Sequence, residues 1–295
     1  MSAFLLRLLP TLALTAVLLR AAPAAAYQCT PVTDGEGRVV SPAVSQVWNQ
    51  RCLPYFLQRG NNLFSGEAQR LLVSQSFSVW ENNTCTDLDF VDLGYTSNGP
   101  GFDSNKSGNE NVITAIENAS ELGAYFPEPN MVAITVTAFS TLSGEIFDAD
   151  VVVNASSFEF TDVADENACR AMSNPPFDLR AILIHEIGHF IGFDHEDDTE
   201  STMFFSAPTC ETKKRTLTDD DILGLCTVYA TAQPPATCAA PSTAYDEVAG
   251  ASSFRQQCER RLSSASGCTC ANPTTIGSWW ALLAAGALLA LRKRQ

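Results

Sequence analysis

The stretch 185–195 is HEIGHFIGFDH, and it holds all three histidines of a chain of 295 residues. Its apolar spacing predicts a helix, and on a helix His185 and His189 lie one turn apart on the same face. His195 is too far along to join them if the helix continues. Gly192 can adopt a left-handed conformation, so we expect the helix to end there and the chain to turn back. The three imidazoles are therefore predicted to converge.

Converging imidazoles indicate a metal site. Three neutral histidines that leave one position open are the ligand set of a catalytic zinc, whereas structural zinc usually takes four protein ligands. Glu186 would lie beside the ion without binding it, where it could act as a general base on a water molecule. The alternative is that the histidines pack in the core, and the short pattern HExxH alone leaves this open. The longer pattern HExxHxxGxxH is far more specific.

This longer pattern resembles the metzincin metallopeptidases, and the residues after it narrow the resemblance. Met203, eight residues after His195, is spaced like the methionine turn of the matrixins. The segment LTDDDILGLCTVY (217–229) is similar to the matrixin C-terminal helix, and SGEIFDADVVVN (143–154) resembles a strand of bacterial matrixin-like enzymes. The resemblance covers about 45–230.

The resemblance implies an α+β fold, namely a matrixin-like catalytic domain with a twisted, mixed five-stranded sheet, three main helices and a zinc cleft. It also implies an endopeptidase that hydrolyses protein or peptide substrates by zinc-activated water, with Glu186 as the general base and Met203 as the floor below the ligands. One Zn²⁺ is expected, because no histidine remains for a second one. The alternative function is a non-catalytic, metal-containing surface binding or adhesion module.

The substrate is expected to lie extended along the sheet edge formed by Met131–Thr137. The residues 204–208 would line the pocket for the residue after the cut. The substrate-binding residues implied by the resemblance are Ile134, Phe204, Phe205 and Pro208.

Hydrophobic periodicity, turn residues and capping residues predict the elements of the body. Strands are expected at 52–58, 87–94 and 111–118, and a hairpin at 130–139 and 145–154. Helices are expected from Ser65 to about Asn82, from Asp178 to Gly192 and from Thr218 to about Tyr229, with Ser65 and Asp178 as N-caps.

Both ends of the chain differ from this body. Residues 1–26 have the pattern of a secretory signal peptide, with a retained membrane anchor as the alternative. Residues 27–230 are expected to form the matrixin-like zinc peptidase domain, and 231–267 an Ala/Ser/Pro-rich linker. The segment 268–295, with its cysteines, apolar run and terminal basic cluster, resembles the Myxo-type sorting tails of bacterial surface proteins. An ordinary single-span anchor is the alternative, and both place the protein at the cell surface or outside the cell.

The charge of the central region argues against one class of partner. Between the two ends the chain carries 33 acidic and 13 basic residues, which argues against nucleic-acid binding. We expect a monomer that contacts the membrane only through the tail before processing. Calcium could be bound by acidic residues, with a solvated acidic face as the alternative. These residues are Asp148, Asp150, Asp162, Asp165 and Glu166.

The ten cysteines predict disulfides, because their number is even and a signal peptide precedes them. Sequence alone does not determine the connectivity. The pairs suggested first by proximity along the chain are Cys210–Cys226 and Cys238–Cys258.

Overall fold

The computed structural model describes residues 27–40, 44–105, 109–128 and 130–231. The predicted signal peptide, the sorting tail and almost all of the linker lie outside these residues. Within them, no helix has the length and apolar character needed to cross a membrane.

The centre of the fold is a mixed five-stranded sheet with the order β2-β1-β3-β5-β4. Four strands run parallel, namely β1 (Cys52–Gln58), β2 (Asp89–Thr96), β3 (Val112–Ala115) and β5 (Ile146–Val153). The edge strand β4 (Ala133–Phe139) is antiparallel to β5, as the predicted hairpin requires. The predicted mixed five-stranded sheet is thus confirmed, and β4 offers one edge that no strand among the described residues covers.

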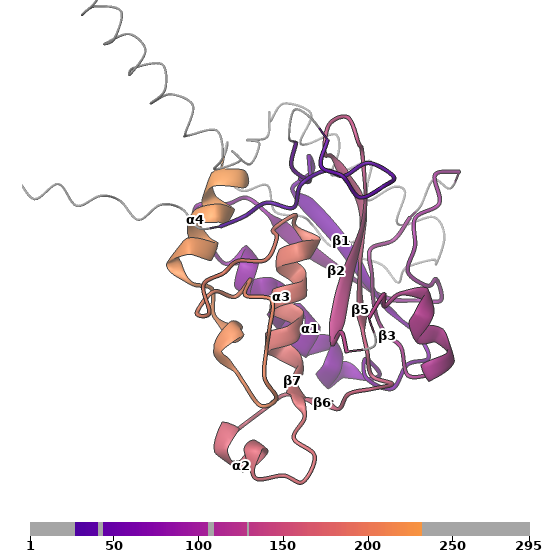
Figure 1. Cartoon of the computed structure of the whole chain (residues 1–295), viewed down its shortest axis with the longest axis vertical. Coiled ribbons are helices and arrows are strands. Elements are labelled where there is room, and N and C mark those ends of the chain that lie inside the picture. The colour runs from indigo at the N-terminus through magenta and orange to yellow at the C-terminus, as the bar shows by residue number, and fades with distance from the viewer. Residues whose placement is uncertain (1–26, 41–43, 106–108, 129, 232–295) are drawn as a thin grey trace, which may run out of the picture.

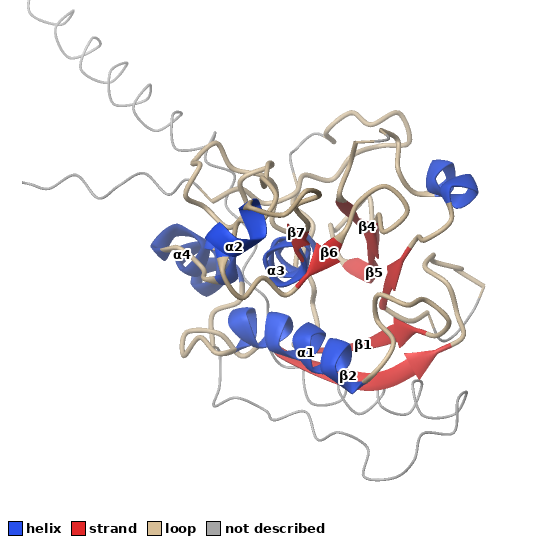
Figure 2. Cartoon of the chain, turned by 90° about the horizontal axis from the view of Figure 1, so that it is seen from below, coloured by secondary structure: helices blue, strands red, loops and turns tan. Residues whose placement is uncertain are grey.

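Three main helices accompany the sheet, as predicted: α1 (Glu67–Glu81), α3 (Leu179–Phe190) and α4 (Asp219–Val228). In both views α3 stands between the sheet and α4 (Figures 1 and 2). Shorter elements complete the fold. They are the helix α2 (Glu166–Arg170), the 3-10 helices η1 (Ala119–Ala124) and η2 (Lys213–Arg215), and a two-stranded sheet of β6 (Phe160–Thr161) and β7 (Phe177–Asp178).

Of the two predicted N-caps, Asp178 is confirmed and Ser65 is not, and the structure adds Thr218 as a third cap residue. Asp178 accepts a hydrogen bond from the backbone N–H of Ala181, and Thr218 forms a capping box with Asp221. The prediction that Ser65 caps α1 is wrong. Gly66, with φ of 105°, is the N-cap residue, and the Ser65 hydroxyl donates instead to the Asn62 carbonyl in the preceding turn.

Three buried aromatic residues from different parts of the chain hold α3 in place. Trp80 of α1 donates its indole N–H to the carbonyl of Ile184 (2.8 Å), and Trp48, before β1, donates to that of Phe190 (2.7 Å). The hydroxyl of Tyr229, after α4, donates to a carbonyl at the helix end, that of residue 191 (2.6 Å). Since buried N–H and O–H groups need partners, these contacts fix the axial position of the helix as well as its packing.

Two disulfides have different partners from those suggested by the sequence. Cys85 pairs with Cys226, and Cys169 pairs with Cys210, so the predicted pair Cys210–Cys226 is wrong. The reason is spatial: Cys210 is buried beside α2, whereas Cys226 lies on α4 near the end of α1. The suggested pair Cys238–Cys258 lies outside the described residues.

A carboxyl pair next to the core predicts a pH-dependent stability. Burial, followed by a hydrogen bond with Asp89, raises the pKa of Glu81 from 4.5 to about 8. A carboxyl group with a raised folded-state pKa stabilises the fold fully below pH 4.5, and this contribution is lost as the pH rises to about 8. We expect Glu81→Gln to flatten the fall in stability across this range, because the amide stays neutral and can still donate to Asp89.

The measurement is the free energy of unfolding in urea at pH 5 and pH 8 for both proteins. Glu67→Gln, at the exposed start of the same helix, is the control and should keep the wild-type dependence. Equal pH dependence in wild type and Glu81→Gln would show that Glu81 is not the group responsible.

Candidate metal centre and catalytic cleft

The histidines converge because α3 ends in a tight turn. The backbone N–H of Gly192 donates to the carbonyl of His189, and that of Phe193 donates to the carbonyl of Gly188. Gly192 has φ of 93°, a left-handed conformation that glycine adopts without strain. The turn brings Nε2 of His195 to 3.1 Å from Nε2 of His189.

The N-terminal segment holds this turn from outside, which the sequence did not indicate. Thr30 donates its backbone N–H to the carbonyl of Gly192, and Asp194 donates to the carbonyl of Gln28. A Cβ atom on Gly192 would lie only 2.3 Å from the carbonyl oxygen of Gln46. Glycine is therefore required at this position for its conformation and for its small size.

Two backbone carbonyls orient the imidazoles. Nδ1 of His185 lies 2.7 Å from the carbonyl of Thr202, and Nδ1 of His189 lies 2.7 Å from that of Phe193. A carbonyl can only accept, so Nδ1 carries the proton in each ring and Nε2 keeps its lone pair. Burial lowers the pKa of His185 well below 6.5 and that of His189 to about 4, and it also lowers the pKa of His195. All three rings are thus neutral near pH 7, as metal binding requires.

The geometry of these nitrogens fits zinc. One ligand atom from each histidine lies within 4.8 Å of the others, and among the described residues this is the one such group of three or more His, Cys, Asp or Glu side chains. Two nitrogens bound to a tetrahedral zinc at about 2.0–2.1 Å lie about 3.3 Å apart, close to the spacing of His189 and His195. Three nitrogen donors leave the fourth position open.

Glu186 is buried beside the histidines and is held from the edge strand. The hydroxyl of Thr135 on β4 lies 2.7 Å from Oε2 of Glu186 and 2.9 Å from its carbonyl oxygen. Burial raises the pKa of Glu186 to about 7, and the hydrogen bond from Thr135 opposes this shift. A carboxyl group with a pKa near 7 can both accept and return a proton at neutral pH.

Met203 lies under the helix that carries the ligands. Its sulfur would be 2.2 Å from a Cβ atom on Gly188, so the methionine fills the space that this glycine leaves open. The backbone N–H of Glu196, directly after His195, donates to the carbonyl of Met203 (3.0 Å). The turn that contains the methionine is therefore bound to the segment that carries the third histidine.

Asp221 connects this turn to α4. Its carboxylate accepts hydrogen bonds from the Ser201 hydroxyl (3.1 Å) and the Thr202 backbone N–H (3.2 Å), in addition to those of Thr218 in the capping box. Thr202 is the residue whose carbonyl orients His185. Asp221, which lies in the segment 217–229 that resembles the matrixin C-terminal helix, therefore supports His185 through one intermediate residue.

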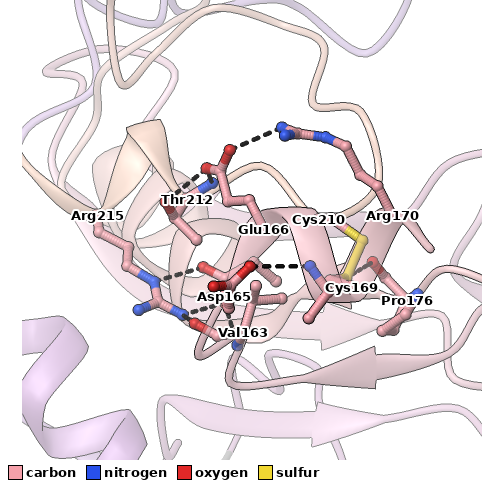
Figure 3. The surroundings of a disulfide bond; sticks show 11 residues. Val163, Asp165, Glu166, Cys169, Arg170, Pro176, Cys210, Thr212 and Arg215 are labelled. Carbon is pink, nitrogen blue, oxygen red and sulfur yellow. Dashed lines mark hydrogen bonds and ion pairs between the residues drawn. A yellow bond between two sulfur atoms is a disulfide. The ribbon is translucent and has the colours of Figure 1, made fainter. Parts of the chain in front are cut away.

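A second set of contacts anchors the loop that follows Met203 (Figure 3). The disulfide Cys169–Cys210 joins it to α2, and Glu166 accepts hydrogen bonds from the backbone and hydroxyl of Thr212. Arg215 binds both carboxylate oxygens of Asp178, the residue that caps α3. The loop after Met203 and the start of α3 are therefore one connected unit.

Acidic residues considered for calcium take part in this unit. Asp162 pairs with Arg180 and Arg215, Asp165 caps α2, and Glu166 pairs with Arg170. In the structure these carboxylates bind protein groups, and calcium binding stays a prediction.

The imidazoles and Glu186 open into a cleft of about 570 Å³, which is within the range of ligand-binding pockets. The edge segment Met131–Thr135 forms one side of it. Of the predicted substrate-binding residues, Ile134 and Phe205 line the cleft, whereas Phe204 and Pro208 do not; Ser206 and Ala207, which lie between them, do.

The sequence does not indicate that two polar residues, Thr135 and Lys214, line the cleft beside Glu186 and His185. Thr135 is one of several threonines in a β-branched strand, and Lys214 is one of two adjacent lysines in a loop. No spacing rule separates either from its neighbours, because their positions depend on contacts with α3.

Comparison with known proteins places the central region of the chain in one family. Residues 47–230 match the family described as matrixin. The chain is 28% identical over 201 residues to Metalloendoproteinase 2-MMP of Arabidopsis thaliana, an alignment that covers 64% of this chain and 46% of that protein. It is 36% identical over 67 residues to Metalloendoproteinase 1 of Glycine max, covering 23% of this chain and 22% of that protein. The chain thus spans less than half the length of each relative.

Proposed function

The chain belongs to the matrixin family, and on this premise we propose that it is a zinc-dependent endopeptidase. The observation that carries the proposal is the convergence of three neutral imidazoles next to the buried carboxyl group of Glu186, at the bottom of an open cleft. His185, His189 and His195 would hold the metal through Nε2. Bound zinc would supply Lewis acidity, which lowers the pKa of water to about 7 and polarises a carbonyl group.

In this proposal Glu186 moves the protons. Its carboxylate accepts a proton from the attacking water and then donates it to the amine of the leaving peptide. The hydrogen bond from Thr135 fixes which oxygen faces the cleft, since Oε2 is already engaged. Burial of Glu186 keeps bulk water from competing for the proton.

The edge strand would hold the substrate. Among the described residues β4 pairs with a strand on one side only, namely β5, so its other edge offers backbone N–H and C=O groups to an extended peptide. This edge lines the cleft beside Glu186. A peptide that adds to the sheet here would place a carbonyl group next to the metal centre, which favours cleavage within a chain.

We also propose that the protein is exported. The disulfides Cys85–Cys226 and Cys169–Cys210 support an oxidising compartment. The roles of 1–26 as a signal peptide and of 268–295 as a sorting segment are part of this proposal.

The test is a joint measurement of zinc content and of cleavage of an unfolded protein substrate. We expect one zinc per chain, loss of cleavage on treatment with a chelator, and recovery on addition of Zn²⁺. His189→Ala is expected to lose both zinc and cleavage, because it removes one of the three ligands. Cleavage that persists after complete removal of metal would contradict the proposal.

A further inference from the structure

Lys214 of η2 has an unusual position for a lysine. Its side chain lines the cleft beside His185 and Glu186, yet the residue is only 2% exposed. Its ammonium group donates to the carbonyl of Phe204. Lysine is rarely buried to this degree unless its charge is paired.

No carboxylate pairs with this ammonium group among the residues that the structure describes. Nδ1 of His185 is 3.3 Å away, but its proton is committed to the carbonyl of Thr202, so it cannot accept a hydrogen bond. Glu186 and Glu211 act on Lys214 only as more distant charges, and Glu186 is bound to Thr135. Lys214 therefore has donors to spare.

The surroundings restrict what could use these donors. The lining of the cleft that Lys214 enters includes the apolar side chains of Phe177, Ile182 and Ala207. A substrate side chain that enters here loses its contacts with water. Its end would then meet the positively charged ammonium group of Lys214. A carboxylate is the group that pairs best with a desolvated ammonium, because an ion pair is much stronger in these surroundings than in water.

We propose that Lys214 binds a carboxylate of the substrate residue that follows the cut, so that the enzyme prefers an acidic residue at this position. The inference rests on the proposed peptidase function. The carboxylate could come from a glutamate or aspartate side chain or from the C-terminus of a short peptide, and these two sources require separate substrates.

The experiment measures cleavage of matched peptides by the intact protein. One pair has an amidated C-terminus and carries either Glu or Gln after the cut. A second pair ends directly after an apolar residue at this position, as a free acid or as an amide. We expect kcat/KM to be at least about tenfold higher for the carboxylate member of one pair. The uncharged member cannot form the charge-assisted hydrogen bond with Lys214, and the loss of such a bond lowers affinity by at least about this factor.

Lys214→Met is expected to remove this preference, so that the two members of the pair are cleaved with equal kcat/KM or, in the binding assay below, bound with equal affinity. The matched control is Lys213→Met, which removes a neighbouring ammonium that pairs with Glu200 outside the cleft. Zinc content and the circular dichroism spectrum show whether each variant is folded. A preference that persists in Lys214→Met, or none in wild type, would overturn the proposal.

Binding provides a readout that does not need activity. Fluorescence anisotropy with the same labelled peptides, on the Glu186→Gln background, compares the affinity for each member of a pair with and without Lys214. Suppose that the carboxylate peptide binds more tightly only when Lys214 is present, but that the protein with Glu186 intact cleaves none of the peptides. The carboxylate site then stands and the peptidase proposal fails. Equal affinities with active cleavage lead to the opposite conclusion.

Discussion

Replacement of Glu186 with glutamine is expected to lower kcat/KM for peptide hydrolysis by roughly 1,000-fold, within the range of about 10²–10⁴ for the loss of a general base. The amide has nearly the same shape, so it can keep its place beside Thr135, but it cannot accept a proton from water. Zinc content should be unchanged, because the three imidazoles and the two carbonyl groups that orient His185 and His189 are untouched. The measurement is a progress curve with an internally quenched peptide, together with zinc analysis of both proteins.

Glu67→Gln is the matched control, since the same chemical change lies at the exposed start of α1. It should leave cleavage unchanged. If Glu186→Gln retained full activity, another group would have to be the base. If the wild-type protein and the variant both bound one zinc and cleaved nothing, the chain would be a metal-containing binding module, which is the alternative function considered from the sequence.

The second large effect is expected on stability, at the turn after α3. Gly192→Ala should lower the free energy of unfolding by at least about 2 kcal/mol, because a left-handed alanine costs roughly 1–2 kcal/mol and its Cβ atom also meets backbone. The atom in question is the carbonyl oxygen of Gln46, 2.3 Å from the Cβ position. The strain can be relieved only by displacing the turn that carries His195, so zinc affinity should fall as well. Urea unfolding and competitive zinc titration measure the two effects.

Gly60→Ala separates conformation from crowding. Gly60 has φ of 92°, almost the value of Gly192, but no atom lies within 4 Å of its Cβ position. Its replacement should therefore cost only the conformational part and leave zinc binding unchanged. Equal losses in the two variants would mean that the contact with Gln46 contributes nothing.

Much of the architecture was predictable because it depends on local patterns. Strand β5 follows from a β-branched run, and the two ends of α3 follow from a capping aspartate and a glycine. Local rules failed where a more distant contact competed. Ser65 turns away from its helix toward Asn62, and Cys210 pairs across the fold with Cys169 instead of with its neighbour along the chain.

The sequence by itself determined the candidate ligand set, the candidate base and the family resemblance, because the spacing along one helix and one turn brings His185, His189 and His195 together and leaves Glu186 beside them. Only the tertiary structure decided what surrounds them. Three groups come from elements outside the helix: the carbonyl of Thr202 that orients His185 from the turn before Met203, the hydroxyl of Thr135 from β4, and the buried ammonium of Lys214 from η2. A helix repeats every few residues and so can be read from spacing, whereas contacts between separate elements depend on how the whole chain packs and leave no periodic signal.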